Sequence, residues 1–89
     1  MSVTEQQISQ FIRETVQEPA QRLGLTLGEL EGDFDLVGSG VLDSMRFVEL
    51  LGAIEQRFNV QIELDGVDIE TVTRVGGLIG VVLAASRNG

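Results

Sequence analysis

The chain has 89 residues, which is enough for one small domain with a single, barely sufficient hydrophobic core. Its net charge of −8 would repel phosphate backbones, which argues against nucleic-acid binding and favours partners with basic patches. Cys, His, Lys and Tyr are all absent, which removes disulfides, thiolate metal sites, the usual general base and Schiff-base chemistry, so we expect no enzyme.

The first predicted helix runs from Thr4 to Glu18. Thr4 and Gln7 have the spacing of a capping box, and a buried face follows at helical spacing: Ile8, Phe11, Ile12, Thr15 and Val16. The only proline, Pro19, predicts that this helix ends near Glu18.

A long loop, residues 20–42, is expected next, because glycines interrupt its leucines throughout. The second predicted helix is Ser44 to Phe58, with Asp43 as its N-cap. Its predicted core face consists of Phe47, Leu50, Leu51, Ile54 and Phe58, whereas Met45 and Glu49 lie on the opposite side and Val48 lies at the edge.

After an extended connector at 59–63, a short third helix is predicted within 65–72, anchored by Val67, Ile69 and Val72. Thr73 is the expected cap of a last helix over 74–86, whose buried face is Val75, Leu78, Ile79, Val82 and Leu83. The sequence therefore predicts an all-α bundle of three principal helices and one short helix, as a single domain over residues 1–89.

No segment favours a membrane or an export route. The longest apolar-rich stretch, 75–85, is too short to span a bilayer, and the first five residues lack the basic start of a signal peptide. We therefore expect a cytoplasmic monomer without membrane insertion.

Ser44 is the best-placed hydroxyl in the chain to carry a phosphodiester. It is the first residue of its predicted helix, where the dipole and unpaired N–H groups favour a phosphate. The chain supplies no base to activate it, so Ser44 is interpreted as a site acted upon. Considered locally, an ordinary helix-start serine is the more common explanation of such a residue.

Two other ligand sites are weighed in the same loop. Asp33, Asp35 and Gly38 half-match a calcium loop, but Val37 and Ser44 stand where two ligands should be, so no metal site is predicted. The segment from Gly38 to Gly40 lacks the lysine and spacing of a P-loop.

The chain also resembles the acyl carrier proteins over nearly its whole length. The resemblance rests on Leu42-Asp43-Ser44-Met45, the preceding Asp33-Phe34-Asp35-Leu36, the following Phe47-Val48-Glu49-Leu50-Leu51, and Thr73-Arg74-Val75-Gly76 near the C-terminus. It implies that 4′-phosphopantetheine is attached to Ser44 and carries an acyl group as a thioester, as in fatty acid or polyketide biosynthesis. The implied partners are a phosphopantetheinyl transferase, a loading enzyme, and downstream acyltransferases or synthases.

The resemblance further implies that acidic residues around the Ser44 helix meet basic patches on these enzymes. We expect Asp43, Met45, Val48 and Glu49 to form the docking surface. Arg46 departs from the fatty-acid carriers, so we expect a specialised carrier. An aminoacyl carrier similar to the D-alanyl carriers, or a small acidic interaction module that is never modified, remains an alternative.

Overall fold

The computed structural model describes residues 3–88, and its first helix, α1 (Glu5–Thr15), begins at the predicted capping box. The Thr4 hydroxyl accepts a hydrogen bond from the N–H of Gln7 at 3.2 Å, and the Gln7 side chain accepts one from the N–H of Thr4 at 3.1 Å. The cap therefore satisfies two N–H groups at an exposed helix end. Ile8, Ile12 and Val16 are fully buried, as predicted, whereas Thr15 is exposed.

Pro19 does not end the helical path, and the predicted helix boundary at Glu18 is wrong. The chain kinks at Val16 and continues as a second short helix, α2 (Gln17–Arg22), with Pro19 in its first turn. The N–H groups of a first turn have no intrahelical acceptor, so the missing N–H of proline costs little there. The bundle thus has two short helices instead of one.

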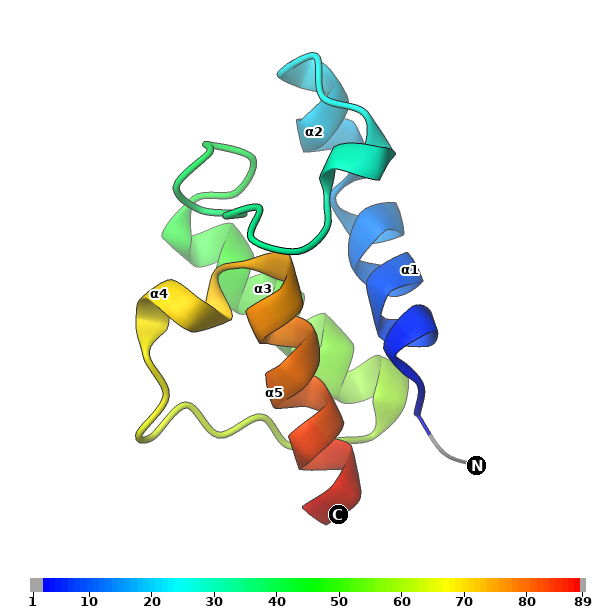
Figure 1. Ribbon diagram of the computed structural model, residues 1–89, viewed down its shortest axis with the longest axis vertical. Coiled ribbons are helices and arrows are strands. Elements are labelled where there is room, and N and C mark those ends of the chain that lie inside the picture. The colour runs from blue at the N-terminus through cyan, green and yellow to red at the C-terminus, as the bar shows by residue number, and fades with distance from the viewer. Residues whose placement is uncertain (1–2, 89) are drawn as a thin grey trace.

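The long loop follows α2 and contains one 3₁₀ turn (Leu27–Glu29). It passes over the start of α5 and then turns back toward the start of α3 (Figure 1). Leu30 and Leu36 are fully buried and Leu42 is 6% exposed, so the apolar residues of the loop complete the core.

Helix α3 (Ser44–Phe58) has the predicted boundaries. Asp43 caps its start, and Asn59 ends it in the left-handed conformation with a φ of 54°. Phe47, Leu50, Leu51 and Ile54 are buried, as the helical spacing predicts.

The connector after α3 is extended, and the described residues contain no β-strand, only an isolated bridge between Asp35 and Arg74. Asp68 then caps α4 (Ile69–Val72) by accepting the N–H of Glu70 at 3.0 Å. Val72 is buried, but Ile69 is 65% exposed, so its predicted role as an anchor is wrong.

The last helix, α5 (Val75–Asn88), is not capped by the Thr73 side chain, contrary to the sequence prediction. Thr73 is the C-cap of α4, and its hydroxyl donates to the carbonyl of Glu70 at 3.4 Å. The long loop supplies the cap instead, because the N–H groups of Val75 and Gly76 donate to the carbonyls of Phe34 and Gly32.

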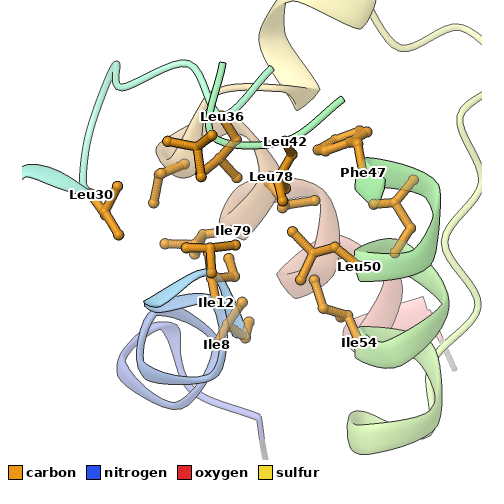
Figure 2. Packing of buried hydrophobic residues seen from close by; sticks show 14 of the residues in the cluster. Ile8, Ile12, Leu30, Leu36, Leu42, Phe47, Leu50, Ile54, Leu78 and Ile79 are labelled. Atoms are coloured by element: carbon orange, nitrogen blue, oxygen red, sulfur yellow. The ribbon is translucent and has the colours of Figure 1, made fainter. Parts of the chain in front are cut away.

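The three longer helices and the loop share one hydrophobic core. Figure 2 shows Ile8 and Ile12 of α1, Leu50 and Ile54 of α3, and Leu78 and Ile79 of α5 in one interior together with Leu30, Leu36 and Leu42 of the loop. The molecule is therefore the predicted all-α bundle, and the loop packs across the end of the bundle where α3 begins.

Candidate functional site

The segment that leads to Ser44 is fastened to the junction of α4 and α5. The N–H of Leu36 donates to the carbonyl of Thr73 at 2.8 Å, and the N–H of Val75 donates to the carbonyl of Phe34 at 2.9 Å. The guanidinium of Arg74 adds a third bond, to the carbonyl of Asp33 at 2.8 Å. These bonds hold the loop against the junction of α4 and α5.

Asp35 organises the turn that follows. One carboxylate oxygen, Oδ1, accepts the N–H groups of Val37 at 3.0 Å and Gly38 at 2.8 Å. These bonds, led by that of Gly38, lower the pKa of Asp35 below its usual value despite partial burial, with help from Thr73 and Arg74. The two aspartates that half-match a calcium loop therefore have different environments, and Oδ1 of Asp35 is already hydrogen-bonded to two backbone N–H groups.

The last residues of the loop lead directly into α3. Val41 and Leu42 are 4% and 6% exposed, so they anchor the chain in the core immediately before the helix. Asp43 then accepts the N–H of Arg46 through Oδ1 at 2.7 Å, and its carbonyl accepts the N–H of Phe47 at 2.9 Å. The predicted cap is confirmed, and the first turn of α3 starts at a fixed place.

Ser44 is the first residue of α3 and is exposed. Within residues 3–88, its hydroxyl forms no hydrogen bond, and no acceptor contacts the backbone N–H groups of Ser44 and Met45. The dipole of a 15-residue helix and these two donors favour a negative group at this end. An accessible hydroxyl in this setting fits the covalent attachment of a phosphodiester.

Ser39, the other serine of the loop, has a different environment. Its hydroxyl donates to the carbonyl of Leu36 at 3.5 Å and accepts the N–H of Val41 at 3.4 Å. Ser39 therefore takes part in the turn and lies at no helix start.

The outer face of α3 carries the residues predicted to dock partners. Met45 is 74% exposed and Val48 is 64% exposed, and both Asp43 and Glu49 are exposed as well. Ile69 of α4 is a further exposed apolar side chain, which the sequence analysis missed because its spacing matched that of a buried anchor. Isolated apolar residues on a surface are common, so exposure by itself gives these residues no role.

Within residues 3–88, no group of three or more acidic, His or Cys side chains is arranged to hold a metal ion. None of the helices in that range is long and apolar enough to cross a membrane.

The family profile described as a phosphopantetheine attachment site matches residues 10–81, a span that begins in α1 and ends in α5. No significant match was found among curated proteins or among solved structures. Domains of the matched family are non-catalytic carriers to which 4′-phosphopantetheine is covalently attached, and they work with a phosphopantetheinyl transferase and biosynthetic enzymes. Because the match covers most of its length, the chain belongs to the family of phosphopantetheine-carrying carrier proteins.

Proposed function

We propose that the chain is an acyl carrier protein whose 4′-phosphopantetheine is attached to Ser44. The observation that carries this proposal is the exposed hydroxyl of Ser44 at the start of α3, beside backbone N–H groups that form no hydrogen bond within the described residues 3–88. The shared core of α1, α3 and α5 supports a single carrier domain over residues 1–89.

Ser44, Asp43 and the attached group have different roles in the proposed function. Ser44 contributes only its oxygen, which would form a new bond to the pantetheine-bearing phosphorus of coenzyme A as the pyrophosphate bond breaks and adenosine 3′,5′-bisphosphate leaves. The serine proton would pass to a base on the transferase, since the chain has no His, Lys or Cys to accept it. Asp43 holds the first turn of α3 through the N–H of Arg46, which fixes the backbone from which the Ser44 side chain projects. The attached group supplies the thiol that this Cys-free chain lacks, and that thiol holds the acyl group as a thioester.

The proposed docking surface consists of Asp43, Met45, Val48 and Glu49. The acidic pair would steer basic partner enzymes toward Ser44, and the exposed side chains of Met45 and Val48 would then be buried in the complex. Arg46 is also exposed and lies between these residues in the sequence, which supports a partner with a complementary acidic group.

The experiment is an intact-mass spectrum of the protein isolated from its own cells. A mass increase of one phosphopantetheine supports the proposal, and any additional mass identifies the cargo as acyl or aminoacyl. A protein that always has the unmodified mass would contradict it and would favour an acidic interaction module.

A further inference from the structure

We propose that Asp35 is a positioning residue for the transfer of phosphopantetheine to Ser44. Its carboxylate holds the turn that connects the loop segment bonded to the α4–α5 junction with the start of α3. This inference rests on the proposed function of Ser44. Asp35 touches none of the reacting atoms and acts through the loop.

The first step is the closure of the loop. With Oδ1 of Asp35 bonded to the N–H groups of Val37 and Gly38, the chain turns back, and the N–H of Leu42 reaches the carbonyl of Leu36 at 2.9 Å. Residue 42 directly precedes the cap of α3. The turn set by Asp35 therefore determines where Asp43 and Ser44 begin the helix.

The turn is packed as well as hydrogen-bonded. A Cβ atom on Gly38 would lie 2.6 Å from Oδ2 of Asp35, which is closer than real Cβ atoms come to their neighbours. Gly38 thus leaves the space in which the carboxylate of Asp35 lies, and the two residues act as one unit.

The second step is the connection to the rest of the bundle. Asp35 forms the isolated antiparallel bridge with Arg74, and its neighbours Phe34 and Leu36 bond to Val75 and Thr73. The residue that sets the turn is thus also the residue at which the loop meets the α4–α5 junction. Loss of the turn would leave the bridge in place but would free the segment between Leu36 and Asp43.

The third step links position to rate. A reacting group misplaced by about 1 Å can lose on the order of 100-fold in rate, because transfer needs a near-attack geometry. The core contacts of α3 through Phe47, Leu50 and Ile54 do not involve Asp35, so the helix itself should persist without the turn. Removing the carboxylate should therefore slow transfer to Ser44 more than it unfolds the bundle.

The test compares three variants of the full chain, with a phosphopantetheinyl transferase and coenzyme A as substrates. Asp35→Ala removes the acceptor. Asp35→Asn keeps an oxygen at the Oδ1 position, which takes both backbone bonds, and so should rescue the turn without the charge. Asp33→Ala is the matched control, because it removes an exposed carboxylate of the same loop whose side chain makes no hydrogen bond within the described residues.

We expect Asp35→Ala to lower kcat/KM for modification by roughly 10- to 100-fold, mainly through kcat. Asp35→Asn should remain within a few-fold of the unsubstituted chain, and Asp33→Ala should match it. Modification of Asp35→Ala at the unsubstituted rate would overturn the inference. So would a loss of rate in Asp33→Ala equal to that in Asp35→Ala, because the effect would then be one of loop charge.

A folding check and a replacement variant keep the test decisive. If Asp35→Ala does not fold, as judged by circular dichroism, Gly38→Ala replaces it, since the added methyl group displaces the same carboxylate. Gly38→Ala should then show the same loss of kcat, and an unchanged rate would overturn the inference. If the unsubstituted chain itself is never modified, the proposed function fails, whereas an unsubstituted rate in folded Asp35→Ala or folded Gly38→Ala refutes only the role of Asp35.

Discussion

Replacement of Met45 by glutamate should separate folding from partner recognition. Met45 is the second residue of α3 and is 74% exposed, so the fold buries about a quarter of it. Full burial of a methionine side chain contributes about 1.5–3 kcal/mol, so the contacts at risk amount to roughly 0.4–0.8 kcal/mol. A carboxylate in the first turn of a helix returns about 0.3–1 kcal/mol through the helix dipole.

These opposing contributions nearly cancel, so we expect Met45→Glu to change the melting temperature by no more than about 4 °C. Leu50→Ala is the contrasting variant: Leu50 is 2% exposed, and its truncation should cost about 2–5 kcal/mol, or at least roughly 8 °C.

The assay measures melting temperature and the rate of phosphopantetheine transfer on the same samples. Met45→Glu should keep its melting temperature and lose most of its modification rate, because an apolar pocket on the enzyme would have to accept a charge. A large drop in melting temperature would show that Met45 belongs to the core. A preserved rate would show that Met45 is not a docking residue.

Three further outcomes are expected. Cargo loading should slow as ionic strength rises, since screening weakens the attraction between this acidic chain and basic partners, and a salt-independent rate would remove charge-guided docking. The lowered pKa of Asp35 means that its ionised form stabilises the fold at neutral pH, and this stabilisation should be lost in acid titrations as the pH falls below about 4. The stability of Asp35→Asn should fall less over the same pH range, because this variant has no carboxylate to protonate at position 35. Gly77→Ala should destabilise the fold by about 1–3 kcal/mol in urea, because the new methyl group would collide with the carbonyl of Thr71, whereas Gly80→Ala meets nothing and should gain up to about 1 kcal/mol.

The elements that depend on neighbouring residues could be predicted from the sequence. The boundaries of α3 follow from Asp43 at one end and Asn59 at the other, and its buried face follows from the spacing of Phe47, Leu50 and Ile54. The exposure of Ser44 and Met45 follows from the same helical phase. Their roles in attachment and docking stay predictions.

The elements that depend on residues far apart in the chain could not be predicted from the sequence. Thr73 is a residue type that often caps helices, yet the N–H groups at the start of α5 donate to carbonyl groups of the loop. The loop is held there by a hydrogen bond from Arg74 to Asp33, which joins residues 41 positions apart. The sequence predicts no structural role for Asp35, which belongs to a half-matched calcium loop and to the segment that carries the family resemblance, because its bonds to Val37 and Gly38 depend on how the chain turns. The helix end predicted from Pro19 is wrong for a related reason, since the effect of a proline depends on whether it falls inside a helix or in the first turn of a new one.

The central claim, that Ser44 carries the phosphopantetheine, is tested most directly by two serine variants incubated with a phosphopantetheinyl transferase and coenzyme A. Ser44→Ala should fold, since Asp43 still caps α3, and it should show no mass increase. Ser39→Ala changes the neighbouring hydroxyl, which only bridges loop atoms, and should gain the full phosphopantetheine mass. Modified Ser44→Ala, or folded Ser39→Ala that stays unmodified, would contradict the assignment.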